Sequence, residues 1–137
     1  MEREQLNFFL QQADGKELKA LCVRIEEEAE VELLQKPTAQ TLLVPVDDPV
    51  NGGSFIGGEV LVTSAIVHVN EVGGWAMVMD DDPAKAISVA TLDAAFAARI
   101  RLDEIVRLAL QGRDLHERKT NERNSRVEST KVAFDLL

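Results

Sequence analysis

The chain has one cysteine, no tyrosine and one tryptophan among its 137 residues, and each scarcity argues against a class of protein. A single cysteine cannot form an internal disulfide, nor can it supply a cysteine-based metal cluster. Aromatic residues make up only 4% of the sequence, so there is little to build the stacking platforms on which single-stranded nucleic acids bind. The sequence therefore points away from a disulfide scaffold and from a nucleic-acid-binding protein.

Long apolar runs and an excess of positive charge are also missing. No segment approaches the ~20 apolar residues that a membrane-spanning helix needs. The formal net charge of −9 opposes binding to nucleic acid or to anionic lipid. The first five residues lack the basic and then apolar pattern of a secretory leader. We therefore expect a cytoplasmic protein with no nucleic-acid partner and no membrane partner.

The acidic charge is distributed unevenly along the chain. Residues 1–112 carry nine Lys and Arg against 19 Asp and Glu, net −10, whereas residues 113–126 carry five cations against three anions, net +2. A mildly basic segment on an acidic body can orient docking onto a partner. The same composition also suits a solvated helix face, so the sequence leaves both interpretations open.

Two helices are predicted at the N-terminal end. Residues 2–12 place apolar side chains at helical spacing, Asp14-Gly15 interrupts the pattern, and a second helix then extends to about Ala29. Cys22 lies on the apolar face of this second helix, which favours a buried structural thiol over a reactive one. Residues 26–28 are three glutamates at a helix C-terminus, where cations are preferred. Either the helix ends early or these carboxylates face a basic partner.

The middle of the chain predicts the sheet. Four segments, residues 31–34, 41–46, 59–69 and 75–79, are rich in β-branched and apolar residues and are bounded by turn or breaker residues. Both faces of segment 59–69 are largely apolar, so we expect this strand to be central and covered on both sides. Pro45 suggests an edge position or a bulge in its strand. The prediction is a central, mainly antiparallel sheet of about four strands.

The C-terminal third predicts helices and a strand-like tail. Asp82-Pro83 has the signature of a helix start, and the apolar pattern continues to Gly112, which we expect to end the helix. Residues 113–126 have no apolar stripe and predict a solvated helix or a flexible connector. Residues 132–136 alternate with a period of two, as in a strand that joins a sheet edge in its own domain or in another. The whole chain, residues 1–137, is expected to be a single α+β domain.

The stretch from Asn51 to Gly58 is rich in glycine, and the backbone N–H groups of such a loop can cradle a phosphate. However, it lacks the Lys-Ser/Thr of a P-loop and leads into a strand, not a helix. The carboxylates of Asp47 and Asp48 beside it would repel an anion. A tight structural turn is therefore favoured over a ligand cradle.

No catalytic set is recognisable. His68 and His116 are the two histidines, and neither lies in a Ser/His/Asp or Cys/His motif. The acidic run Asp80-Asp81-Asp82 could hold Mg²⁺ or Ca²⁺ through oxygen ligands. Its position at a helix N-terminus explains it more simply, because carboxylates are stabilised there. We expect no catalytic residue and no metal site, and a free-standing hydrolase would require the fold to bring a histidine and a carboxylate together.

Several motifs of the chain occur in the same order in a known family. They are the Gly-Gly loop, Gly58-Glu59 opening a strand that contains Thr63, Leu92-Asp93-Ala94 in an Ala-rich helix, and the final segment Ser129-Thr130-Lys131-Val132-Ala133-Phe134. In this order, and over most of its length, the chain resembles the PhnG family, the G subunits of the bacterial carbon–phosphorus lyase system that degrades phosphonates.

The resemblance implies an accessory role in an enzyme complex. In that family, G, H, I and J subunits form a core assembly that replaces the adenine of ATP with a phosphonate, giving ribose 1-phosphonate 5-triphosphate. The base displacement is attributed to the I subunit and the carbon–phosphorus cleavage to the iron–sulfur J subunit. This chain would then be a non-catalytic subunit of a ribose 1-methylphosphonate 5-triphosphate synthase. It would bind no cofactor itself, because ATP and the phosphonate are substrates of the assembly.

The resemblance also implies partners. An I-type subunit is expected first, then H and J types, and the isolated chain could form a homodimer. The candidate ligand or partner contacts are Asn51, Gly52, Gly53, Gly57, Gly58, Glu59, Thr63, Lys131 and Phe134. The family usually carries arginines where this chain has Ser64 and the Asp80–Asp82 run, which implies fewer phosphate donors here. The alternatives are a small nucleotide- or phosphonate-binding module and a divergent scaffolding homologue outside the lyase.

Overall fold

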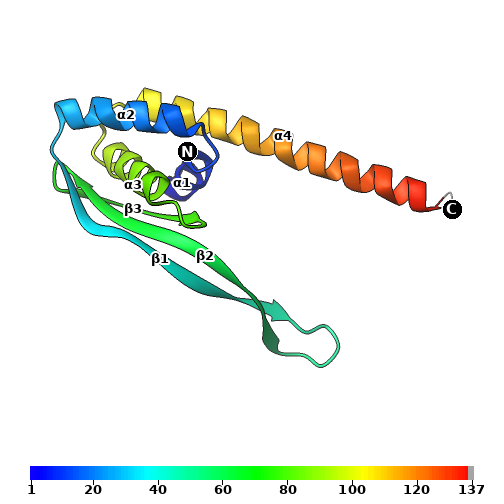
Figure 1. The fold of residues 1–137 in the computed structure, drawn as a ribbon. Helices are drawn as coiled ribbons and strands as arrows, with labels where there is room; N and C mark the ends of the chain where they lie inside the picture. Colours follow the sequence, from blue (N-terminus) through cyan, green and yellow to red (C-terminus); the bar gives the residue numbers. More distant parts are fainter. Residues whose placement is uncertain (136–137) are drawn as a thin grey trace.

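The computed structural model describes the backbone of residues 1–135 and the side chains of residues 1–54 and 56–126. Within that part of the chain, four helices and three strands follow in the order α1 (Arg3–Leu10), α2 (Gly15–Glu28), β1 (Val31–Asp47), β2 (Ser54–Val69), β3 (Val72–Met79), α3 (Pro83–Ala97) and α4 (Leu102–Asp135) (Figure 1). The α+β class is confirmed. The predicted number of about four strands is corrected to three in the described part.

The two strands predicted at residues 31–34 and 41–46 are one strand, β1. The sheet order is β1-β2-β3, which makes β1 an edge strand. Shifts of register between Leu33 and Gln35, and again between Gln35 and Thr38, carry the chain past Lys36-Pro37 without ending the pairing. A proline is tolerated there because the outer side of an edge strand has no ladder partner that needs its N–H.

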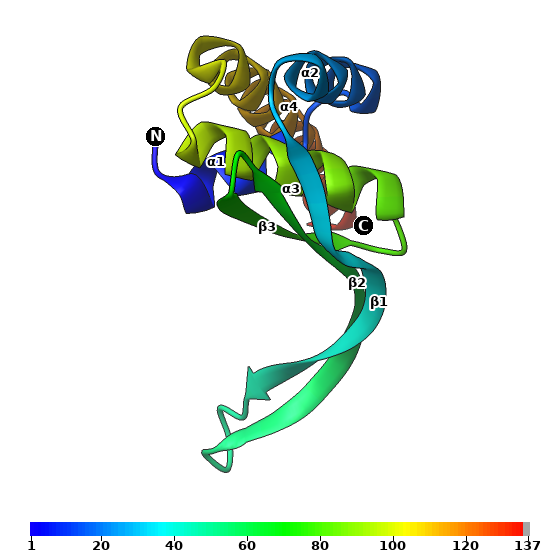
Figure 2. The ribbon, with the colours of Figure 1, turned by 90° about the vertical axis from the view of Figure 1, so that its left-hand side faces the viewer.

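β2 is the central strand, as expected, and both of its neighbours are antiparallel to it. β1 pairs with all of β2, whereas β3 pairs only from Val62 to Val69. The outer part of the β1–β2 hairpin, residues 39–61, is named the hairpin arm here. Figures 1 and 2 show this arm extending away from the helices and ending in a turn.

The helices cover only one face of the sheet, so the expectation that β2 is covered on both sides is wrong. α3 packs on the face that carries Ala65, Val67 and Val78, all of which are buried. α1 lies beside α3, and α2 and α4 form the layer beyond them (Figure 2). The opposite sheet face has no helix over it, which leaves Trp75 50% exposed and Met79 59% exposed.

The close packing of α3 on the sheet follows from its alanines. A Cβ on Gly74 of β3 would overlap the backbone nitrogen of Ala94 and the carbonyl oxygen of Ala90. Small residues on both sides therefore let the two backbones approach directly. The predicted helix start is confirmed, since the Asp82 carboxylate accepts a hydrogen bond from the Lys85 N–H at 3.1 Å and Pro83 opens the helix.

The helix predicted from residue 84 to Gly112 is divided. Arg99 and Arg101 have φ angles of 62° and 51°, so the chain turns sharply there and α4 begins at Leu102. Gly112 does not end the helix, because it lies where α4 crosses α1 and a Cβ would overlap the carbonyl oxygen of Phe9. This glycine permits a close helix crossing and is not a helix C-cap.

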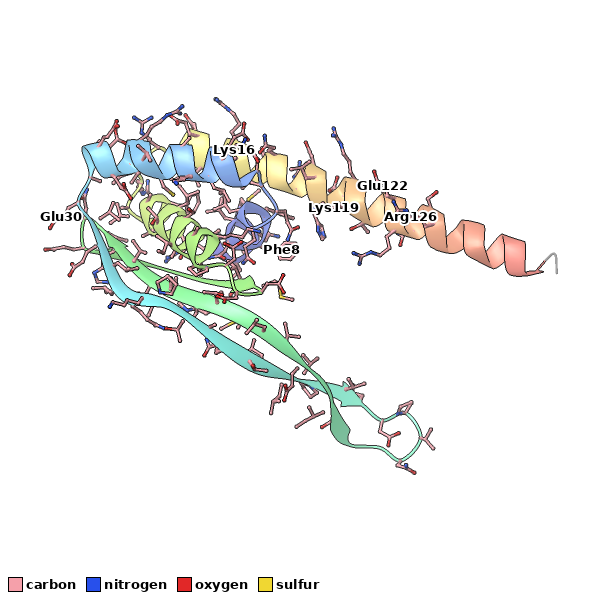
Figure 3. All side chains as sticks on the ribbon, viewed as in Figure 1. Phe8, Lys16, Glu30, Lys119, Glu122 and Arg126 are labelled. Carbon is pink, nitrogen blue, oxygen red and sulfur yellow. The ribbon has the colours of Figure 1, made fainter. Side chains whose placement is uncertain are left out.

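α4 continues through Asp135, and its second half projects away from the rest of the protein (Figure 1). Residues 113–126 are therefore a solvated helix, one of the two forms expected for them. The predicted strand at residues 132–136 is wrong as far as Asp135, where the backbone is helical, and Leu136 lies outside the described residues. Lys119, Glu122 and Arg126 lie on this projecting half (Figure 3).

For Glu28, the last of the three glutamates of α2, the chain itself supplies a basic partner. α2 extends to Glu28, and the Arg101 guanidinium donates to both Glu28 carboxylate oxygens, at 2.6 and 3.2 Å. The basic partner is therefore an arginine from the turn before α4. In the described part of the chain, no helix is both long enough and apolar enough to cross a membrane.

Candidate interaction site

The uncovered side of the sheet is hollowed into an apolar groove of about 680 Å³. We call this surface the groove. It lies between α1, the edge strand β3 and the base of the hairpin arm. Its apolar lining comes from four elements: Phe8, Leu42, Leu43, Val44, Pro45, Val60, Val62, Trp75, Met77 and Met79. Strand alternation explains part of the set, because cross-strand pairs such as Leu42 with Val60 and Val62 with Met79 share one face of the sheet. Leu43 and Pro45 belong to the other face of β1 and line the groove as well.

One wall of the groove is a hydrogen-bonded seam between α1 and β3. Arg3, Asn7 and Gln11 donate to the carbonyl oxygens of residues 73, 75 and 77 at 3.0, 2.8 and 3.0 Å. Four helical residues rise about 6 Å and two strand residues about 6.6 Å. Every fourth residue of α1 can therefore reach every second carbonyl group of β3. The seam satisfies acceptors that an edge strand would otherwise expose, and it blocks the addition of another strand to β3.

Asp93 of α3 accepts hydrogen bonds from both sides of this seam. It is 5% exposed and accepts hydrogen bonds from the Arg3 Nε at 3.1 Å, the Arg3 Nη2 at 2.9 Å and the Trp75 backbone N–H at 3.0 Å. The hydrogen bonds from the guanidinium to the Asp93 carboxylate raise the pKa of Arg3 above its usual value. One buried carboxylate thus joins α1, β3 and α3.

The polar side chains of this wall are already engaged inside the protein. Arg3, Asn7, Gln11 and Asp93 all line the groove, and each makes the internal hydrogen bonds given above. The rest of the lining is mainly apolar, with Glu4 and Gln12 of α1 as its other polar members. In the described part of the chain, no three His, Cys, Asp or Glu side chains cluster as metal ligands would. The groove is therefore suited to being covered by an apolar surface of another molecule.

The glycine-rich turn at the tip of the arm is organised around Asp48. Its carboxylate oxygen Oδ1 accepts from the backbone N–H groups of Val50 and Asn51 at 2.9 and 3.2 Å, and these bonds lower the pKa of Asp48. The Gly52 N–H donates to the Asp48 carbonyl oxygen at 3.1 Å. Gly52 and Gly53 have φ angles of 72° and 75°, which explains why glycines stand there. Two of the N–H groups expected to cradle a phosphate, those of Asn51 and Gly52, therefore already bind Asp48.

The remaining glycine candidates lie in β2 within the hairpin arm. A Cβ on Gly57 would overlap a methyl group of Val46, at the point where the pairing shifts register between Val44 and Pro45. Gly58 and Glu59 follow and are exposed. The tip and this stretch share the arm, so the structure brings the candidates Asn51 to Glu59 into one element.

Thr63 lies apart from these residues. It is fully buried, and its hydroxyl donates to the Asp80 carbonyl oxygen at 2.6 Å and accepts from the Asp82 N–H at 3.0 Å. It thereby holds the turn that starts α3. The backbone of Lys131 and Phe134 belongs to α4, but their side chains lie outside the described residues. The structure therefore does not assemble the nine candidates into one site.

The histidines and the cysteine lie outside the groove lining. The His116 ring meets the Phe8 ring edge-on, with centroids 5.1 Å apart, and His68 lies on β2 near Gly73 (Phe8 is labelled in Figure 3). Cys22 is buried, as predicted, and its thiol donates to the Ser88 carbonyl oxygen at 3.4 Å. Burial raises the pKa of this thiol to about 12.

Sequence reasoning missed the groove and the seam. The alternation of Trp75, Met77 and Met79 gave a usable signal, because large apolar residues at every second position mark one face of a strand. Whether a helix covers that face is decided by the tertiary packing. The seam had no comparable signal, since Arg3, Asn7 and Gln11 have the composition of an ordinary solvated helix face.

Compared with known proteins, the chain matches one family over residues 1–137, and that family is described as "Phosphonate metabolism protein PhnG". No curated protein matches it.

Proposed function

This chain belongs to the PhnG family of phosphonate metabolism proteins, and we propose that it acts as a non-catalytic subunit of the carbon–phosphorus lyase assembly. In this role it supports the formation of ribose 1-phosphonate 5-triphosphate from ATP and a phosphonate during phosphonate degradation. Its principal partner is the I-type subunit, to which base displacement is attributed.

The observation that carries the proposal is the chemistry of the groove. The groove is mainly apolar, and Arg3, Asn7, Gln11 and Asp93 around it are engaged within the protein. A site for a triphosphate would need cationic side chains or backbone N–H groups free to bind it. An apolar hollow beside exposed Trp75 and Met79 instead suits another protein surface.

Co-expression with the I-type subunit from the same genome tests the proposal. We expect one co-eluting species in size-exclusion chromatography with light scattering at micromolar concentration. Trp75 is the only tryptophan of this chain and is half exposed in the groove. If the I-type subunit is made without tryptophan, its binding over the groove should shift the fluorescence emission of Trp75 to shorter wavelength. Separate elution of the two proteins would reject the proposed role.

The reconstituted assembly supplies the functional readout. With ATP and methylphosphonate as substrates, adenine release by the other subunits should fall sharply when this chain is left out and return when it is added back. Release that is the same with and without this chain would also reject the role.

A further inference from the structure

The hairpin arm carries apolar side chains on both of its faces. Cross-strand partners share a face, so Leu42 with Val60 marks one side and Pro45 with Ile56 marks the other. Leu42 is 40% exposed and Ile56 is 60% exposed, and Leu43, on the same side as Ile56, is 57% exposed. Neither face of the arm is the polar side of a sheet that packs on its own core.

The rest of the described chain does not cover these two faces. β3 pairs with β2 only as far as Val62, and Figures 1 and 2 show the arm extending beyond the helices. A two-stranded ribbon without a third strand or a helix against it is marginally stable in water. The arm therefore has the apolar composition of a buried hairpin, but the rest of the described chain leaves both of its faces exposed.

The charge on the arm indicates what covers it. Residues 39–61 contain Asp47, Asp48 and Glu59 and no Lys or Arg. Apposing the arms of two copies would bring six carboxylates together with no cation between them, in chains that each carry a net charge of −9. The basic segment 113–126 of a second copy could supply cations, but Leu115 is its only large apolar residue. Neither of these two surfaces of a second copy therefore offers both an apolar cover and cations.

We propose that the hairpin arm inserts into an apolar cleft of a different protein subunit, which covers both faces and places cations beside Asp47 and Glu59. This inference rests on the proposed function and specifies how this subunit docks. The open groove at the base of the arm fits the same geometry, because its apolar lining runs from the arm to β3 and a partner around the arm could cover both.

Two single variants test whether both faces are covered. Leu42→Asn changes one face, and Ile56→Asn changes the other at a residue outside the groove lining. Val23→Asn is the matched control on α2, where the side chain is 44% exposed. Val and Asn have similar helix propensities, so the control should fold normally. Each arm variant should weaken binding to the I-type subunit by at least about tenfold, and the control by less than about twofold.

The charge component is tested separately. Asp47→Asn combined with Glu59→Gln leaves Asp48 in place to hold the turn. This double variant should bind more weakly at low salt and show a smaller loss of affinity as salt is raised. An unchanged salt dependence would overturn the cationic part of the inference.

Hydrogen exchange on the unmodified chain keeps the test decisive if an arm variant fails to fold. Amides of residues 39–61 in both strands should exchange at least about tenfold more slowly in the complex than in the isolated chain. Unchanged exchange in a complex that does form would overturn the arm inference and leave the proposed function standing. Absence of any complex would reject the proposed function instead.

Two other outcomes also count against the inference. If only one of the two single-face variants weakens binding, the arm lies on a surface and is not inserted. If the isolated chain forms a dimer that Leu42→Asn and Ile56→Asn dissociate, the occupant is a second copy.

Discussion

Replacing Asp93 by alanine is the sharpest test of how this fold is held together. The substitution leaves the Trp75 N–H without an acceptor, and a lost hydrogen bond to a buried charged group costs about 1.5–3 kcal/mol. The ion pair with Arg3 adds less, about 0.5–1 kcal/mol, because the Arg3 side chain is 49% exposed and can be rehydrated. Alanine is the better helix former by about 0.6 kcal/mol, which offsets part of the loss. The expected net destabilisation is about 2–3 kcal/mol.

Urea denaturation followed by circular dichroism at 222 nm measures this effect without relying on Trp75 fluorescence. Asp93→Asn retains an acceptor for the Trp75 N–H and should cost less, about 1–2 kcal/mol. Arg24→Ala is the matched control, because the Arg24–Glu104 pair is solvent-exposed and should contribute no measurable stability. If Asp93→Ala unfolds within about 0.5 kcal/mol of the unmodified chain, the anchoring role of this carboxylate is refuted.

Further substitutions probe the close contacts and the tip. Gly74→Ala should lower the free energy of unfolding by about 3 kcal/mol because its Cβ meets the α3 backbone, whereas Gly73→Ala, which meets only a histidine side chain at 3.5 Å, should cost under about 1 kcal/mol in the same denaturation assay. Gly112→Ala should destabilise the protein despite alanine's helix propensity, and a rise in melting temperature would contradict the proposed α1–α4 crossing. Burial holds the Cys22 pKa at about 12 against an ordinary value of 9.0, so the native state keeps a proton that the unfolded state loses. Stability should therefore fall as pH rises from 9 toward 12, by up to about 1.4 kcal/mol per pH unit, and Cys22→Ala should reduce that slope. Calorimetry of the isolated chain with ATP or methylphosphonate should show no binding tighter than about 1 mM, since Asp48 already takes the donors of the tip; a tighter dissociation constant would favour the small-ligand alternative.

Local sequence signals predicted most elements where one residue type decides the backbone. Asp82-Pro83 started α3 because a carboxylate cap and a fixed φ angle act within a single turn. The apolar spacing around Cys22 identified the buried face of α2 for the same local reason. Two of the errors came at Lys36-Pro37 and Gly112, where residues that usually end an element were accommodated by an edge position and by a helix crossing.

Composition, charge and helical or strand periodicity thus determined the α+β class, the central antiparallel strand, the buried thiol and the absence of a recognisable catalytic motif, because each depends on residues close together in the chain. The groove, the Arg3–Asp93–Trp75 anchor and the uncovered arm were decided by tertiary structure alone. They join residues up to 90 positions apart, and their character depends on which sheet face the helices leave open. Periodicity shows that a face is apolar, but only the packed fold shows whether the same chain covers it.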